Sequence, residues 1–152
     1  MLDITPYSAL GSPSFSGDLL DRKRILIADD HPEFLGDLRS LLISEYDVAG
    51  AVQDGRALTE AAQNLAPDLI ISDISMPVMS GFEAAARILA LRLEAKIIFL
   101  TIQSSTAYVA KARSLGAKGY VLKTHATEQL PIAVSKVLAG ETFVSPELGC
   151  AL

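Results

Sequence analysis

The chain has 152 residues, half of them apolar and a fifth charged, a composition that fits one globular domain and excludes a disordered or coiled-coil chain. Its 18 acidic and 13 basic residues give a net charge of −5, which argues against a broad basic surface for direct binding of nucleic acid. Cys150, the one cysteine, cannot form an internal disulfide, and because the sequence has no long apolar span and no export signal, we expect a cytoplasmic protein that makes no membrane contact.

Residues 1–22 mix glycine, proline and serine with no helical or strand period, so we expect a flexible leader there. The pattern changes at residue 23, because short apolar runs then alternate with segments whose apolar residues recur every three or four positions, which is typical of βαβ units. The predicted strands are 24–28, 47–52, 68–72, 96–101 and 118–123. Most of these runs are apolar on both faces, so helices must cover both sides of a central parallel sheet.

The segments between the strands, and the one after the last strand, carry the apolar stripes of helices. These stripes lie at residues 34–42, 58–65, 82–89 and 130–138. A further helix is predicted over 104–115, and because it offers mainly alanine for burial, we expect it to be the most loosely packed of the five. Pro32 suits the first turn of a helix, and Gly116 and Gly140 directly follow two predicted helix ends.

Polar side chains follow the carboxyl ends of the predicted strands, where open parallel sheets bind their ligands. They are Asp29, Asp30, Asp73, Thr101 and Lys123. Three carboxylates in one place repel each other unless a cation offsets their charge, and oxygen ligands with room for water favour Mg²⁺. We therefore expect Mg²⁺ at Asp30 and Asp73, with Asp29 acting through a water molecule.

The same residues are suited to phosphoryl transfer. Asp73 is the expected nucleophile toward a phosphohistidine, because in-line attack needs mainly positioning and the neutralisation of charge. Mg²⁺ and Lys123 would neutralise the phosphoryl oxygens, and Thr101 would donate a hydrogen bond to them.

This pattern resembles a response-regulator receiver domain of two-component signalling, over residues 23–140. The matching segments are IADDHP with the acidic pair, SDISMPVMSG with Asp73, FLTIQ with Thr101, and GYVLK with Tyr120 and Lys123. The resemblance implies a single α/β domain of the flavodoxin-like (βα)5 type. Its doubly wound parallel sheet would have five strands in the order 2-1-3-4-5.

The resemblance also implies roles for individual residues. The backbone carbonyl of Ser75 would be a further ligand of Mg²⁺, and Tyr120 would change rotamer together with Thr101. A sensor histidine kinase would be the phosphoryl donor. The domain would be a phosphoacceptor that promotes its own phosphorylation and dephosphorylation, not an enzyme with turnover, and phosphorylation would favour a homodimer.

The stretches DDHP and AGETFVSPEL resemble the NarL/FixJ subfamily, whose members usually carry a C-terminal helix-turn-helix. On that resemblance, residues 141–152 would be a C-terminal tail or the start of a linker to an output domain that is not in this chain. DNA would be reached, and transcription controlled, only through that output domain. The alternative function is a stand-alone or unphosphorylated receiver that acts only through protein contacts.

Two positions depart from the pattern of the family. Ile102 follows the switch threonine at a position where a small residue is common, so we expect it to crowd the phosphoryl path and slow phosphorylation. Thr124 follows Lys123 at a position where proline in a cis peptide is common. Because a cis bond to a non-proline residue costs about 3 kcal/mol, we expect a trans peptide there.

Simpler roles also exist for several of these residues. Asp29 and Asp30 alone would be explained as caps of the first helix, and His31 is better explained as a capping residue than as a phosphate donor or metal ligand. Tyr120 alone would be explained as core packing. A third function, a Mg²⁺-dependent phosphatase or phosphotransferase with an aspartyl-phosphate intermediate, is disfavoured because Ser75 stands where such enzymes usually need a second aspartate.

Overall fold

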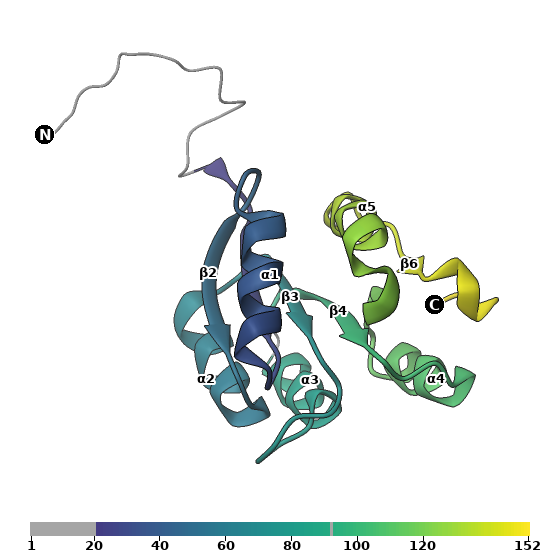
Figure 1. The fold of residues 1–152 in the computed structure, drawn as a ribbon. Helices are drawn as coiled ribbons and strands as arrows, with labels where there is room; N and C mark the ends of the chain where they lie inside the picture. The colour runs from purple at the N-terminus through teal and green to yellow at the C-terminus, as the bar shows by residue number, and fades with distance from the viewer. Residues whose placement is uncertain (1–20, 92) are drawn as a thin grey trace, which may run out of the picture.

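A parallel sheet of six strands forms the centre of the computed structural model, which describes residues 21–91 and 93–152. Nearly all of the leader predicted over 1–22 therefore lies outside the described residues. The strand order is β2-β1-β3-β4-β5-β6 (Figure 1). The strands are β1 (Arg24–Ala28), β2 (Asp47–Val52), β3 (Leu69–Ser72), β4 (Lys96–Thr101), β5 (Gly119–Leu122) and β6 (Phe143–Val144). The first five confirm the predicted strands to within one residue at either end.

Helices cover both faces of this sheet (Figure 1). They are α1 (Pro32–Leu42), α2 (Gly55–Leu65), α3 (Gly81–Ala90), α4 (Thr106–Ser114) and α5 (Ala126–Leu138), with two short 3₁₀ turns, η2 (Lys123–His125) and η3 (Pro146–Leu148). α1 and α5 pack on one face, and α2, α3 and α4 pack on the other. The doubly wound order 2-1-3-4-5 is confirmed. None of the helices in the described part of the chain combines the length and the apolarity that a membrane span requires.

The sheet contains one strand more than the five that were predicted. β6 pairs in parallel with β5, with Phe143 opposite Gly119 and Val144 opposite Tyr120. A strand of this length has no period that a sequence pattern could reveal, so the expectation of five strands was incomplete. β6 lies within residues 141–152, the segment for which a tail or linker was expected.

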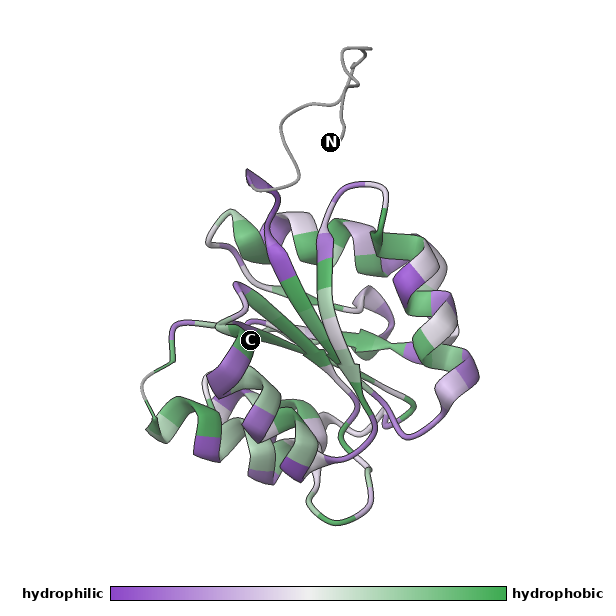
Figure 2. Ribbon diagram, turned by 90° about the vertical axis from the view of Figure 1, so that its left-hand side faces the viewer, coloured by the Kyte–Doolittle hydropathy of each residue, from purple (hydrophilic) through white to green (hydrophobic). Residues whose placement is uncertain are grey.

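The buried side chains form two clusters, because successive residues of a strand point to opposite faces. In β1, Ile25 and Ile27 face α1 and α5, whereas Leu26 faces α2 and α3. Figure 2 shows the strands as a hydrophobic band between helices of mixed polarity. Both faces are thus filled by packing, and the strand ends are the places where polar side chains gather.

α4 has the fewest buried residues of the five α-helices. It buries Val109 and Ala112, whereas each of the other four helices buries three or more residues. This agrees with the expectation, drawn from its weak apolar stripe, that the fourth helix is held least firmly.

The helix ends follow local chemistry. Gly116 and Gly140 follow α4 and α5 with φ of +89° and +93°, a left-handed conformation in which glycine avoids the steric cost of a Cβ. Ser80 and Glu83 form a capping box at the start of α3, in which the hydroxyl accepts from the Glu83 N–H at 3.1 Å and the carboxylate accepts from the Ser80 N–H at 3.4 Å. α3 therefore begins at Gly81.

We predict that Gly81→Ala destabilises the fold by about 2 kcal/mol or more, because a Cβ at this position would overlap the carbonyl oxygen of Asp73. Gly36→Ala is the matched control, since a Cβ there, on the exposed side of α1, would meet nothing within 4 Å. This control should gain about 0.5–1 kcal/mol from helix propensity. Urea unfolding measures both variants, and equal midpoints for the two would contradict the close approach of Gly81 to Asp73.

Candidate functional site

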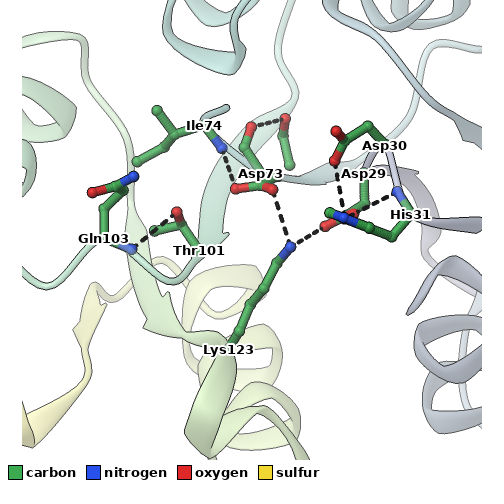
Figure 3. A network of polar contacts seen from close by, with 9 residues as sticks. Asp29, Asp30, His31, Asp73, Ile74, Thr101, Gln103 and Lys123 are labelled. Carbon is green, nitrogen blue, oxygen red and sulfur yellow. Dashed lines mark hydrogen bonds and ion pairs between the residues drawn. The ribbon is translucent and has the colours of Figure 1, made fainter. Parts of the chain in front are cut away.

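Four strands each bring one polar side chain to the carboxyl edge of the sheet (Figure 3). They are Asp29 after β1, Asp73 after β3, Thr101 at the end of β4 and Lys123 after β5. The two aspartates and the threonine are nearly inaccessible to solvent, at 1%, 6% and 0% exposure. The structure therefore brings these predicted site residues together, although they are far apart in the sequence.

The Lys123 ammonium lies between the two buried carboxylates. Its Nζ is 2.6 Å from Asp29 Oδ2 and 3.0 Å from Asp73 Oδ2, and it also lies 4.6 Å from the centre of the Phe34 ring. Burial alone would lower the pKa of Lys123, but the hydrogen bonds to Asp29 and Asp73 outweigh this effect and raise the pKa above its ordinary value. Lys123 is therefore a firmly charged group, and the ring of Phe34, which sequence reasoning missed, adds a cation–π contact.

The backbone around Asp73 holds its carboxylate in one orientation. Asp73 Oδ1 accepts a hydrogen bond from the Ile74 N–H at 2.7 Å, and Oδ2 faces Lys123 (Figure 3). The Asp73 N–H donates to the Ala28 carbonyl at 3.0 Å, and the Ser72 hydroxyl donates to the Asp73 carbonyl at 2.7 Å. These bonds place a carboxylate at the end of a rigid strand, which is the positioning that a nucleophile needs.

Asp29 and His31 interact at the start of α1. Asp29 Oδ1 accepts a hydrogen bond from the His31 N–H at 2.9 Å, while its other oxygen contacts Lys123. The interpretation of Asp29 as a helix cap alone is therefore wrong. His31 occupies the N-cap position of α1, but its side chain makes no capping hydrogen bond. His31 therefore stands at the predicted capping position, but its side chain does not cap the helix.

Asp30 has a buried oxygen, Oδ1, without a hydrogen-bond partner. His31 Nδ1 lies 3.1 Å from this oxygen, but it has hydrogen-bond geometry only toward Asp29. Leaving a buried acceptor without a donor costs about 1–3 kcal/mol, which a bound cation would remove. Asp29, Asp30 and His31 offer ligand atoms within 4.8 Å of one another. Since carboxylate oxygens are the donors that hard cations prefer, the residues present fit Mg²⁺.

Ser75 lies on the same open pocket as Asp30. This pocket has a volume of about 600 Å³ and is also lined by Ile74, Met76, Pro77, Ser80, Phe82 and Tyr108. The shared pocket agrees with the predicted role of the Ser75 carbonyl, which stays a prediction. Its walls are mainly apolar, so the carboxylate of Asp30 is the charged group among them.

The two predicted switch residues contact the backbone of the same residue, Gln103. Thr101 Oγ1 accepts a hydrogen bond from the Gln103 N–H at 3.3 Å, and the Tyr120 hydroxyl donates to the Gln103 carbonyl at 2.7 Å. The Tyr120 side chain is fully buried. Gln103 is thus the physical link between the two residues, and sequence reasoning missed it because its contacts are made through the backbone. The switch role itself remains a prediction.

The two departures from the family pattern have different outcomes. Ile102 projects into solvent with 71% of its surface exposed, so it contributes little to the core, and its effect on phosphorylation stays a prediction. No peptide bond in the described residues is cis, which confirms the trans peptide expected between Lys123 and Thr124.

Sequence comparison finds relatives over most of the chain. Residues 25–135 match the family described as the response regulator receiver domain. The chain is 38% identical over 127 residues to the uncharacterized transcriptional regulatory protein YvfU of Bacillus subtilis (strain 168), and 37% identical over 126 residues to the transcriptional regulatory protein DesR of the same organism. Each match covers 82% of the chain but only 64% and 62% of the two relatives, so the chain spans less than two thirds of their length.

Solved structures show the same likeness. A two-component response regulator of the LuxR family from Aurantimonas sp. SI85-9A1 superposes with a TM-score of 0.80 at 29% identity, covering 84% of this chain and 93% of that one. The isolated REC domain of RcsB from Salmonella enterica serovar Typhimurium, solved with the phosphomimetic BeF₃⁻, gives a TM-score of 0.78 at 28% identity, covering 85% and 97%.

We predict that Tyr120 makes the stability of the fold sensitive to high pH. Burial, followed by the nearby Tyr108, Asp73 and Cys150, raises the pKa of Tyr120 well above its ordinary value. The folded protein keeps the phenol proton at a pH where the unfolded chain releases it. The stability from this group is therefore fully present below about pH 10 and is lost as the pH rises further.

Urea unfolding at several alkaline pH values tests this expectation. The free energy of unfolding of Tyr120→Phe should fall less steeply above about pH 10 than that of the wild type, because phenylalanine has no proton to lose. Parallel slopes for Tyr120→Phe and the wild type would show that this phenol does not titrate differently in the two states.

Proposed function

This chain belongs to the response-regulator receiver family, and on that premise we propose that it accepts a phosphoryl group from a sensor histidine kinase on Asp73. The observation that carries the proposal is the Lys123 ammonium, which is bonded to both Asp29 and Asp73 at the buried carboxyl edge. It places a positive charge beside the carboxylate that would attack phosphorus, where negative charge develops in the transition state.

In the proposed reaction, one oxygen of the Asp73 carboxylate forms a bond to phosphorus. The bond from phosphorus to the histidine nitrogen of the kinase breaks, and its electron pair stays on that nitrogen. The Lys123 ammonium, which now donates a hydrogen bond to Asp73, donates to a phosphoryl oxygen instead. The Thr101 hydroxyl, which now accepts from the Gln103 N–H, turns to donate to the same group. These groups also favour attack by water on the aspartyl phosphate, so the domain promotes both its phosphorylation and its dephosphorylation.

Mg²⁺ would be held by Asp30, Asp73 and the backbone carbonyl of Ser75, with Asp29 acting through water. The buried Asp30 oxygen that lacks a hydrogen bond supports this assignment, as does the pocket that Asp30 shares with Ser75. When bound, the ion neutralises charge on the transferring phosphoryl oxygens.

The change of conformation on phosphorylation would begin at the residues next to the phosphoryl group. New negative charge on Asp73 attracts the Thr101 hydroxyl away from the Gln103 N–H, and the Gln103 carbonyl accepts a hydrogen bond from Tyr120. The β4–α4 loop and the face formed by α4, β5 and α5 therefore change together, as a shift between two conformations. α4 has few buried side chains, so it can move at low cost.

Control of transcription is the outcome that the relatives favour. YvfU and DesR are transcriptional regulatory proteins longer than this chain, and RcsB has been solved in complex with DNA. We infer that this cytoplasmic receiver acts, as a homodimer when phosphorylated, through a DNA-binding output domain outside the chain. The second candidate, an unphosphorylated receiver that works through protein contacts, is favoured by Ile102 beside the switch threonine.

We predict that a small-molecule phosphodonor with Mg²⁺ adds the mass of one phosphoryl group to the wild-type chain and none to Asp73→Ala, as read by intact-mass spectrometry. Asp37→Asn, which changes an exposed aspartate of α1, should keep the adduct, and chelation of Mg²⁺ should abolish it. A wild type without an adduct would favour the unphosphorylated receiver. An adduct that survives Asp73→Ala would place the modification on another residue.

We also predict that Ile102→Ala is phosphorylated about 3-fold faster or more, on the order of 1 kcal/mol in the barrier, because a smaller side chain leaves the phosphoryl path open. The exposed position of Ile102 means that folding stability should change by less than about 0.5 kcal/mol. Ile132→Ala, a second exposed isoleucine on α5, is the control. Equal rates for all three proteins would show that Ile102 does not obstruct the reaction.

A further inference from the structure

Residues 143–152 form a strap along the last edge of the sheet. β6 runs beside α5, and the C-terminus lies between α5 and α4 (Figure 1). The strap is bonded to β5 through its backbone, because the Phe143 N–H donates to the Lys118 carbonyl at 3.0 Å and the Ser145 N–H donates to the Tyr120 carbonyl at 2.9 Å. The strand that carries Tyr120 thus has this strap as its outer neighbour.

Ser145 is the most deeply buried polar residue of the strap, with no exposed surface. Its hydroxyl accepts a hydrogen bond from the Leu122 N–H at 2.9 Å and donates one to Gln129 Oε1 at 2.5 Å. Ser145 therefore joins three elements, namely the strap, the end of β5 and α5. A buried hydroxyl that loses its partners costs about 1–3 kcal/mol, so the attachment depends on the position of Leu122.

Further contacts fasten the strap to both neighbouring helices. Gln129 Nε2 donates to Glu147 Oε1 at 2.8 Å, and His125 Nε2 lies 3.5 Å from Glu147 Oε2. On the other side, the Arg113 guanidinium of α4 donates to the Ala151 carbonyl at 3.2 Å. These hydrogen bonds and this ion pair therefore connect the strap to both α4 and α5.

The apolar side chains of the strap complete the core on the α4 side. Val144, Leu148, Cys150 and Leu152 pack against the buried cluster that contains Tyr120, Val109 and Ala112. Cys150 lies close enough to Tyr120 to contribute to the raised pKa of the phenol. The strap thus covers the seam between α4 and β5, which is the region that the proposed switch moves.

Ser145 is bonded to the end of β5 that lies next to the site. Leu122, whose N–H it binds, directly precedes Lys123, whose ammonium contacts Asp29 and Asp73. Negative charge added to Asp73 would draw this ammonium toward the phosphoryl oxygens, and that pull would act on the backbone next to Leu122. The hydroxyl of Ser145 has both of its hydrogen bonds in this unphosphorylated structure, so a displacement of the Leu122 backbone would weaken them.

We propose that residues 143–152 are a strap whose attachment through Ser145 weakens when Asp73 is phosphorylated, which uncovers the edge of β5 and the seam beside α4. This inference rests on the proposed function, because it requires a phosphoryl group on Asp73. Ser145 couples the strap to the site, and the strap itself covers the surface beside α4 and β5 that changes on phosphorylation. Such a coupling is reciprocal, so a weaker strap must also make the phosphorylated arrangement easier to reach.

The test uses beryllium fluoride with Mg²⁺ as a stable mimic of the phosphoryl group on the whole 152-residue chain. Hydrogen exchange of the amides in 143–152 should become faster in the wild type when the mimic is bound. Ser145→Ala should bind the mimic about 5-fold more tightly than the wild type, as the reciprocal of that loosening. Calorimetric titration measures this affinity.

Two further variants separate coupling from a general loss of stability. Ser135→Ala, an exposed serine of α5, should bind the mimic as the wild type does. Arg113→Ala frees the far end of the strap without touching β5 and should tighten binding in the same direction by a smaller factor. It keeps the test decisive if Ser145→Ala does not fold.

The outcomes distinguish the two proposals. A wild type that does not bind the mimic overturns the proposed function, and the coupling falls with it. A wild type that binds it with unchanged exchange in 143–152, or with equal affinities in the wild type, Ser145→Ala and Arg113→Ala, overturns the strap alone. Faster exchange together with tighter binding in both variants supports the coupling through Ser145.

Discussion

One ammonium group between two buried carboxylates makes the functional edge of this domain possible. Asp29 and Asp73 follow β1 and β3, which are neighbours in the sheet, so the pairing of these strands forces the two acids together. Two nearly inaccessible carboxylates without a cation would oppose that pairing. Lys123 offsets their charge, and its ammonium reaches them from the end of β5, on the far side of β4. The charge balance of the site therefore depends on the order of the strands in the sheet.

The residues around the Lys123 ammonium form a rigid region at Asp73 and a more weakly held region between β4 and α4. Asp73 is rigid, because its backbone is bonded to Ala28, its carboxylate to Ile74, and α3 begins against its carbonyl at Gly81. In the neighbouring β4–α4 region, the loop has two bonds to the Gln103 backbone, and α4 buries only Val109 and Ala112. A fixed nucleophile beside a weakly held loop suits a domain whose chemistry must be precise and whose response must be a change of shape.

The fold was largely predictable, because short apolar runs that alternate with helical stripes indicate strands covered on both faces. The same runs located five of the six strands. The strap was not predictable, since β6 is two residues long and is held by backbone bonds and by Ser145, and a serine by itself carries no signal of burial. Gln103 was missed for a similar reason, because both of its contacts to the switch residues are made through its backbone N–H and carbonyl.

By itself, the sequence determined which residue types stand at the strand ends and therefore which chemistry the edge can perform. The rule that ligands of parallel sheets bind at carboxyl ends was enough to group Asp29, Asp73, Thr101 and Lys123. Only the tertiary structure decided how they interact: that Lys123 bridges both acids, that an Asp30 oxygen is left without a hydrogen bond, and that the strap covers the responding face. These features depend on distances between side chains from separate elements, and such distances are set by packing in three dimensions.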